Sequence, residues 1–255
     1  MKPRKRFGQH FLHDPGVLQR IVAAIAPLPG DRMVEIGPGE GALTRLLLQA
    51  LPRLCAVEID RDLAARLRLE FGDRLDLREG DALDFDFTSL GPGLRVVGNL
   101  PYNISTPLLF HLASHAAALR DLHFMLQLEV VERMVARPAT PEYGRLSVML
   151  QTRFRMAKLF TVPRGAFRPP PKVESAIVRL QPLPMPPACD PDTLARVVRE
   201  AFSARRKTLR NAIALPAAEL ESLGYDPQLR PENLAPGDFV AIARRVSERS
   251  VEPGE

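Results

Sequence analysis

One stretch of the chain indicates its fold: Val34-Glu35-Ile36-Gly37-Pro38-Gly39-Glu40-Gly41. An apolar run over 32–36, typical of a buried strand, ends in this glycine-rich turn, and a helical pattern over 42–51 follows. The glycines permit a tight turn and the close approach of a ligand. Their Gly-x-Gly-x-Gly spacing differs from the Gly-x-Gly-x-x-Gly of dinucleotide-binding proteins, and an acid stands before the first glycine. The stretch predicts a Rossmann-like sheet with a ligand at this turn.

The next predicted strand, 54–59, ends in Glu58-Ile59-Asp60, and the third, 75–78, is followed by Gly80-Asp81-Ala82. A carboxylate at the first position can accept hydrogen bonds from both hydroxyls of an adenosine ribose, and one at the second from an adenine amine. Ligands of open parallel sheets bind at the carboxyl ends of the strands, where all three turns meet. Together they predict an S-adenosylmethionine site at Gly37, Gly39, Glu58 and Asp81, with NAD as a remote alternative.

A motif suited to amine methylation, Asn99-Leu100-Pro101-Tyr102, follows the fourth predicted strand, 95–98. An amine conjugated to a purine is a poor nucleophile because its lone pair is delocalised. The side-chain oxygen of Asn99 and the carbonyl of Leu100 could accept its two N–H groups and aim it at the methyl donor. Pro101 fixes the backbone, and Tyr102 offers a ring on which an extruded base can stack. These four residues are the predicted catalytic group; a turn around a buried aromatic ring is the structural alternative.

Basic residues are concentrated in segments of a chain whose net charge is +5. Residues 153–181 contain seven basic residues and one acid. Within them the proline-stiffened loop 167–175 predicts that Phe167 stacks on the target base and that Arg168 and Lys172 contact phosphate. The run 202–210 adds four cations predicted to follow an RNA backbone, Arg205, Arg206, Lys207 and Arg210. A rigid loop with a core phenylalanine and a solvated helix face are the alternatives.

The composition is that of a soluble globular protein: 255 residues, of which 45% are hydrophobic and 25% charged. No apolar run reaches the roughly 18–20 residues that span a bilayer, and no secretory signal is evident. Two cysteines fit a reducing compartment, so we expect a cytoplasmic protein. No metal site is expected, because His111 and His115 lack partners at ligand spacing, and neither a nucleophile elbow nor a P-loop is present.

Strand patterns alternate with helical patterns through the first two thirds of the chain, which predicts a parallel sheet with helices on both faces. The runs 154–162 and 175–180 could pair as antiparallel strands at one edge. A proline-rich stretch over 182–187 cannot be regular structure, and short helices are predicted at 192–202, 207–214, 217–223 and 238–246. We therefore predict a class I methyltransferase domain over 1–181, a linker over 182–187 and a small all-helical domain over 188–255.

These motifs resemble those of the ribosomal RNA adenine dimethylase family, and most closely its bacterial small-subunit branch. The matching segments, spread over 7–211, are Phe7-Gly8-Gln9-His10-Phe11-Leu12, the glycine turn, the turns at Glu58, Asp81 and Asn99, Tyr143-Gly144-Arg145-Leu146-Ser147, 167–175 and 205–211. The resemblance implies that His10 and Leu12 close over the cofactor beside Gly37, Glu58, Asp81 and Asn99. Asparagine is also common in the family at position 10.

The resemblance further implies N6,N6-dimethylation of two adjacent adenosines near the 3′ end of 16S rRNA, within an immature small ribosomal subunit. We expect a monomer that also takes part in subunit biogenesis. The alternatives are a macrolide-resistance-type 23S rRNA adenine methylase and a non-catalytic ribosome-assembly or RNA-binding factor. The run 205–211 and the Pro-Pro-Pro-Lys stretch favour the small-subunit type, and the intact cofactor and catalytic motifs argue against a loss of catalysis.

Overall fold

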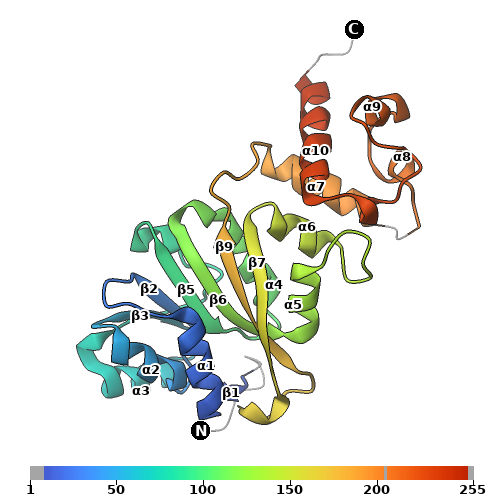
Figure 1. Cartoon of the computed structure of the whole chain (residues 1–255). Coiled ribbons are helices and arrows are strands. Elements are labelled where there is room, and N and C mark those ends of the chain that lie inside the picture. Colours follow the sequence, from blue (N-terminus) through green and yellow to red (C-terminus); the bar gives the residue numbers. More distant parts are fainter. Residues whose placement is uncertain (1–8, 204–205, 252–255) are drawn as a thin grey trace. The chain divides into compact units, whose positions relative to one another are not determined.

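The computed structural model describes residues 9–203 and 206–251, in two compact units (Figure 1). The first unit comprises Met1–Val131 and Arg155–Pro182, and the second comprises Glu132–Phe154 and Leu183–Glu255. The segment 132–154, which the sequence analysis assigns to the first domain, thus groups with the C-terminal helices. Within the described residues, no helix is long and apolar enough to cross a membrane.

The first unit is built on a seven-stranded sheet of order β4-β3-β2-β5-β6-β9-β7. Its strands are β2 (Met33–Ile36), β3 (Leu54–Glu58), β4 (Leu75–Glu79), β5 (Leu94–Asn99), β6 (Leu119–Gln127), β7 (Phe154–Val162) and β9 (Ser175–Pro182). The five strands from β4 to β6 are parallel, which confirms the predicted Rossmann-like sheet. Strands β7 and β9 are neighbours at one edge of the sheet, as predicted. The sequence did not predict that β9 inserts between β6 and β7 and runs antiparallel to β6.

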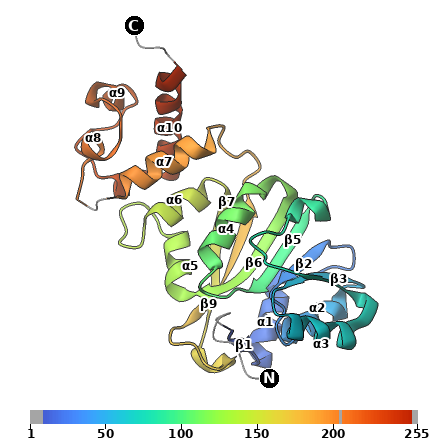
Figure 2. The same cartoon turned by 180° about the vertical axis from the view of Figure 1, so that it is seen from behind.

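Helices cover both faces of this sheet, as Figures 1 and 2 show from opposite sides. The helices α1 (Pro15–Ile25), α2 (Ala42–Ala50) and α3 (Arg61–Phe71) pack their apolar residues into one core on one face, and α4 (Ser105–Ser114) lies on the other. Helix α1 starts at Pro15 because the Asp14 side chain accepts a hydrogen bond from the Val17 amide and proline fits the first turn, where no amide donor is needed.

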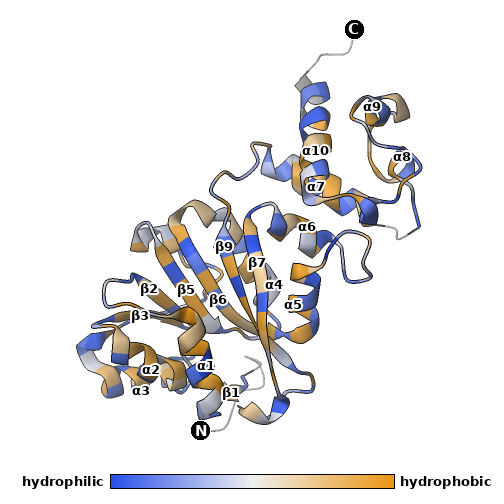
Figure 3. Cartoon of the chain, in the orientation of Figure 1, coloured by the Kyte–Doolittle hydropathy of each residue, from blue (hydrophilic) through white to orange (hydrophobic). Residues whose placement is uncertain are grey.

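The central strands are buried and approach each other closely. All four residues of β2 are buried, as are the first five of β5, and Figure 3 shows orange, apolar stretches along the sheet that blue ones interrupt. Gly98 of β5 lies so near β2 that a Cβ there would be 2.5 Å from the carbonyl oxygen of Ile36. Only glycine fits this position without a shift of the backbone, so Gly98 lets the strand before the Asn99 turn sit tightly beside the glycine-rich strand.

A two-stranded sheet that the sequence analysis does not predict joins the N-terminal segment to a distant loop. Strand β1 (Phe11–Leu12) pairs antiparallel with β8 (Phe167–Arg168), and Leu12 lies opposite Phe167. The His13 amide extends this pairing with a 3.0 Å hydrogen bond to the Ala166 carbonyl. The pairing holds residues 9–13 beside the Rossmann-like sheet.

The second unit is helical. It contains α6 (Arg145–Gln151), α7 (Pro191–Ala201), α8 (Leu209–Ala212), α9 (Ala217–Ser222) and α10 (Pro236–Val251), and α5 (Leu128–Val135) spans the boundary between the units. Its core gathers residues from α6, α7, α9 and α10, including Val148, Val197, Leu220 and Phe239. Helix α8 is only four residues long, shorter than the predicted 207–214, and α5 and α6 are not predicted.

Short 3-10 turns complete the described chain, at Gly72–Arg74, Phe87–Leu90, Ala116–Ala118, Arg164–Ala166 and Pro231–Asn233.

Candidate active site

A cavity of about 290 Å³ opens at the carboxyl ends of the parallel strands in the first unit. Residues from the N-terminal segment, from the glycine turn and from the turns after β3, β4 and β5 line it together. The predicted cofactor and catalytic residues that it brings together are His10, Leu12, Gly37, Gly39, Glu58, Asp81, Asn99, Leu100, Pro101 and Tyr102.

The glycine turn and Glu58 form one hydrogen-bonded unit. The Gly39 amide donates to Oε2 of Glu58 at 3.1 Å, and the Asp60 amide donates to Oε1 at 2.9 Å. Gly39 has a φ of +59°, and a Cβ there would lie 3.1 Å from the ring of Phe11. Burial raises the pKa of Glu58, although the two amide hydrogen bonds oppose that rise. The backbone therefore fixes a buried carboxylate whose remaining lone pairs can accept from a ligand's hydroxyls.

Asp81 stands at the turn after the next strand, and its Oδ1 accepts a 2.9 Å hydrogen bond from the Leu83 amide. That bond orients the carboxylate and leaves Oδ2 as a further acceptor at the cavity wall. The two acids thus provide acceptors at the ends of neighbouring strands, β3 and β4, within a cavity that has mostly apolar walls. This donor and acceptor chemistry fits an adenosine, which carries two ribose hydroxyls and an exocyclic amine.

The Asn99 turn is held by contacts to three different segments. The side-chain nitrogen Nδ2 of Asn99 donates to the His10 carbonyl at 2.8 Å, and the Leu100 amide donates to the Met125 carbonyl at 3.2 Å. The Tyr102 hydroxyl lies 2.7 Å from the hydroxyl of Ser175, and burial raises the pKa of Tyr102. Because the nitrogen of the Asn99 amide is engaged with a carbonyl, its oxygen is the atom left to accept from a ligand.

His10 connects the N-terminal segment to the catalytic turn. Its ring stacks on the Tyr102 ring with centroids 5.8 Å apart and an interplanar angle of 27°. Its Nδ1 lies 2.8 Å from the Pro169 carbonyl. The β1–β8 pairing thus brings His10 and Leu12 to the cavity, a long-range contact for which the short segment gives no periodic signal.

Phe167 differs from its predicted role. Its side chain is 2% exposed and packs in the core with Leu12 and other apolar residues. In the described part of the chain it is not among the residues that line the cavity. In this structure the Phe167 side chain is therefore part of the core, and its stacking on a target base stays a prediction.

A buried acid of the glycine stretch, Glu35, also lies at the cavity, and the sequence motifs assign it no ligand. Glu35 of β2 is 2% exposed, lines the cavity and accepts a 2.7 Å hydrogen bond from the Thr44 hydroxyl. Burial, with a smaller contribution from the Glu58 carboxylate, raises the pKa of Glu35 to about 7. An acid inside a four-residue buried strand is the signal that could have identified it.

The predicted RNA-contacting residues are divided between the two units. Arg168 and Lys172 are exposed in the first unit, and Arg206, Lys207 and Arg210 are exposed in the second. Arg205 lies outside the described residues. Over the part of the chain that the structure describes, no group of three or more His, Cys, Asp or Glu residues could hold a metal ion.

Comparisons relate this chain to known proteins both in sequence and in fold. A family model described as ribosomal RNA adenine dimethylase matches residues 1–247. The chain is 59% identical to the Ribosomal RNA small subunit methyltransferase A of Aromatoleum aromaticum, over 98% of this chain and 96% of that protein. It is also 59% identical to the protein of the same name from Thiobacillus denitrificans, over 97% and 99% of the two chains.

Two solved structures have the same fold over most of their length. A dimethyladenosine transferase from Plasmodium falciparum has a TM-score of 0.83 and 29% identity, covering 94% of this chain and 98% of that one. The 23S rRNA methyltransferase ErmE has a TM-score of 0.72 and 25% identity, covering 93% and 99%.

Proposed function

Because the chain belongs to the ribosomal RNA adenine dimethylase family, we propose that it dimethylates the N6 amine of adenosines in small-subunit rRNA. Family membership makes it an S-adenosylmethionine-dependent rRNA adenine methyltransferase. The proposal concerns the target and the residues that act on it.

The observation on which the catalytic assignment rests is the orientation of the Asn99 amide. Its nitrogen donates to the His10 carbonyl, so its oxygen is available to accept an N–H from the target adenine. The backbone carbonyl of Leu100 accepts the second N–H, and Pro101 fixes the direction of that carbonyl. Holding both hydrogens aims the nitrogen lone pair, and this alignment is the main catalytic contribution of the chain. The amine becomes acidic as it gains the methyl group, so its proton can leave to solvent.

Tyr102 provides a ring for the extruded base. One side of that ring is stacked on His10, so the base would use the other side or displace His10. The hydrogen bond between the hydroxyls of Tyr102 and Ser175 holds the ring in place.

The cofactor, which supplies an electrophilic methyl group on a sulfonium, would be held by the residues around the cavity. Glu58 would accept from the ribose hydroxyls and Asp81 from the adenine amine, while Gly37 and Gly39 allow close approach of the glycine turn. His10 and Leu12 would cover it, because the β1–β8 pairing places both at the cavity.

The target is proposed to be a pair of adjacent adenosines near the 3′ end of 16S rRNA, in a small ribosomal subunit. Support comes from the relatives that are 54–59% identical over nearly the whole chain and are named for the small subunit. Exposed cations on both units, Arg168, Lys172, Arg206, Lys207 and Arg210, supply phosphate contacts. A monomer suffices because one unit carries all the cavity residues, and this substrate places the enzyme in the cytoplasm.

A 23S rRNA target is the second candidate, because the fold of ErmE matches this chain with a TM-score of 0.72. Its 25% identity is far below the 59% shared with the small-subunit relatives, so the small-subunit target is favoured.

The test is to incubate the protein with tritiated S-adenosylmethionine and small subunits from cells that lack this activity, then to digest the RNA to nucleosides. Label in N6,N6-dimethyladenosine from the 16S 3′ region is expected. Label in large-subunit RNA alone would transfer the assignment to the 23S target. Cofactor binding with no label in either RNA would indicate an assembly factor.

A further inference from the structure

A second pocket lies at the starts of the parallel strands, at the sheet edge opposite the candidate active site. It has a volume of about 540 Å³ and is bordered by the segments that lead into β3, β2 and β5 and by the start of β6. Strand β5 connects the two edges, so at about 3.3 Å per residue the pocket lies roughly 17 Å from the catalytic turn. A ligand bound there is therefore separate from both the cofactor and the target base.

Arginine is the main charged residue of this pocket. The charged side chains that line it are those of Asp31, Arg32, Arg53 and Arg120, and the other described lining residues are prolines and glycines. Asp31 already pairs with Arg95 and Arg120. Arg32 and Arg53 form no ion pair within the described part of the chain. The pocket therefore has an excess of positive charge, and its described lining includes no aromatic ring on which a base could stack.

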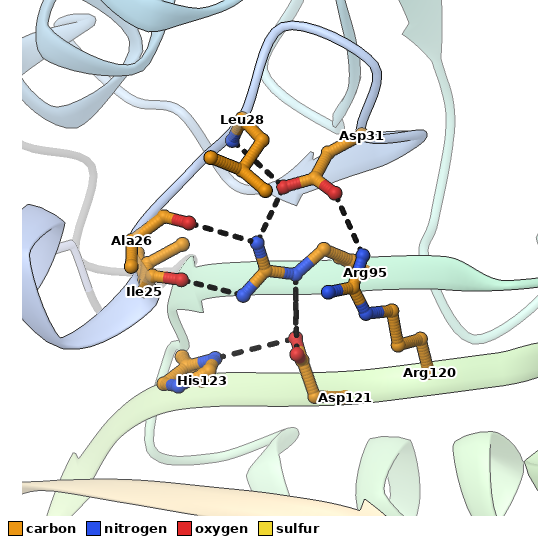
Figure 4. Close-up of polar contacts among 8 residues, drawn as sticks. All are labelled: Ile25, Ala26, Leu28, Asp31, Arg95, Arg120, Asp121 and His123. Atoms are coloured by element: carbon orange, nitrogen blue, oxygen red, sulfur yellow. Dashed lines mark hydrogen bonds and ion pairs between the residues drawn. The ribbon is translucent and has the colours of Figure 1, made fainter.

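Arg120 is held at the pocket by a buried carboxylate, as Figure 4 shows. Its Nη1 donates to Oδ1 of Asp31 at 2.8 Å, and the Asp31 side chain is 4% exposed. The other oxygen, Oδ2, accepts from the Leu28 amide at 2.8 Å and from Nη1 of Arg95 at 2.5 Å. These bonds fix Asp31, and Asp31 fixes one side of the Arg120 guanidinium. Because the Arg120 side chain is 55% exposed, its remaining N–H donors can reach a ligand.

Arg32 is held by the loop before β5. Its Nη1 donates to the Pro92 carbonyl at 2.8 Å. A Cβ at Gly91 would lie 2.6 Å from this nitrogen, so glycine at 91 leaves the space that the guanidinium occupies. Arg53 differs, because no hydrogen bond within the described residues holds its side chain. Two exposed guanidinium groups are thus positioned before a ligand arrives, and donors of this kind lose less conformational freedom on binding.

We propose that this pocket binds a phosphate group, with Arg32 and Arg120 as its hydrogen-bond donors. A guanidinium presents a planar fork of N–H donors that matches the oxygens of a phosphate. Because the described lining has no group that stacks on a base, the same contacts suit inorganic phosphate and a backbone phosphate of RNA. The RNA source alone rests on the proposed function. Arg53 adds positive charge, but its side chain must first be ordered, so it contributes less.

Calorimetry on the full chain, without cofactor or RNA, tests the site with inorganic phosphate in buffers whose ionic strength is matched with chloride. In Arg32→Gln and in Arg120→Gln, phosphate affinity should fall by about fivefold or more, since a hydrogen bond to a charged group is lost. Arg32→Gln is the deciding variant, because it breaks no ion pair. Arg53→Gln should lose about twofold. Arg61→Gln removes an exposed charge outside the pocket, and it should bind phosphate like the wild type.

Filter binding to small subunits from about 50 to 200 mM salt distinguishes the two sources. If RNA supplies the phosphate, Arg32→Gln should flatten the slope of log K against log salt by about 0.7–0.9, and Arg61→Gln should not. If free phosphate is the ligand, Arg32→Gln loses phosphate affinity and keeps the wild-type slope. Unchanged phosphate affinity together with an unchanged slope in Arg32→Gln would overturn the proposal, as would equal changes in Arg61→Gln. Phosphate binding needs neither cofactor nor methylation, so its failure is distinguishable from a failure of the proposed function.

Discussion

The Asn99 side chain has two roles: its nitrogen binds the His10 carbonyl, and its oxygen is proposed to orient the target amine. A mutation should affect cofactor affinity and turnover to different extents, which separates the two roles. In Asn99→Ala the hydrogen bond to the His10 carbonyl is lost, which removes about 1 kcal/mol of support for the N-terminal segment. Cofactor affinity should therefore fall by no more than about fivefold. Turnover should fall by roughly a hundredfold or more, because the target amine is no longer aligned.

Calorimetry with S-adenosylhomocysteine and single-turnover methylation of small subunits measure the two effects. Asn99→Asp is the matched control, since it keeps an acceptor for the amine but cannot donate to His10. It should bind cofactor like the alanine variant and retain more turnover. Wild-type turnover in Asn99→Ala would refute the aligning role.

The buried carboxyl of Glu35 should make the free energy of unfolding fall as pH rises. Its pKa is raised to about 7 by burial, above its ordinary value in the unfolded chain. As pH rises from about 4.5 through 7, the unfolded chain releases this proton first, so the contribution of Glu35 to the free energy of unfolding falls. Glu35→Gln removes that loss and keeps an acceptor for Thr44. The variant should be more stable than the wild type at pH 8 by up to roughly 3 kcal/mol, and nearly equal at pH 4.5.

Urea unfolding of both proteins at the two pH values measures this difference. A gap of the same size at pH 4.5 and pH 8 would show that the carboxyl does not titrate as its burial implies.

At the scale of single elements, the burial of Phe167 in β8 predicts how its mutation changes stability. Its fully covered ring faces the core, so Phe167→Ala should lower the free energy of unfolding by about 3–5 kcal/mol. Phe167→Leu fills much of the same space and should cost less, with methylation near the wild-type rate. Denaturant unfolding and methylation rates test this. A leucine variant that is stable but inactive would favour the base-stacking role instead.

The same pair shows what local sequence can and cannot predict. The strands and helices around the glycine turn follow from period and capping: α2 covers Ala42–Ala50 of the predicted 42–51, and α1 begins after the Asp14 cap with a proline in its first turn. The β1–β8 pair joins two-residue strands more than 150 residues apart, too short for any periodic pattern. The placement of β9 between β6 and β7 is also set by contacts between distant segments. An apolar strand could pair equally well beside β6 or at the outer side of β7, so its own sequence does not decide the order.

Some residues of the candidate site could likewise be predicted from local sequence, and others could not. Gly39, Glu58, Asp81 and Asn99 could be selected because strand ends of a parallel sheet meet at one edge. The core position of Phe167 and the burial of Glu35 depend on what covers each side chain, which only the packed structure provides.

For the whole molecule, the net charge of +5 leads to a prediction about salt. RNA binding should weaken as salt rises, with a slope in log K against log salt of roughly −0.7 to −0.9 for each phosphate contacted. Lys207 and Arg210 are exposed in the second unit. The double variant Lys207→Ala/Arg210→Ala should flatten the slope by about 1–2 and leave cofactor affinity unchanged.

The control variant is Arg53→Ala/Arg61→Ala, which removes the same charge from exposed positions in the first unit. Filter binding to small subunits from about 50 to 200 mM salt measures both slopes. If long-range attraction to the net charge governs binding, the two double variants should weaken association alike. If Lys207 and Arg210 contact phosphates, only their variant flattens the slope, because counterions are released at contacts. Equal slopes in both variants and the wild type would remove this segment from the RNA interface.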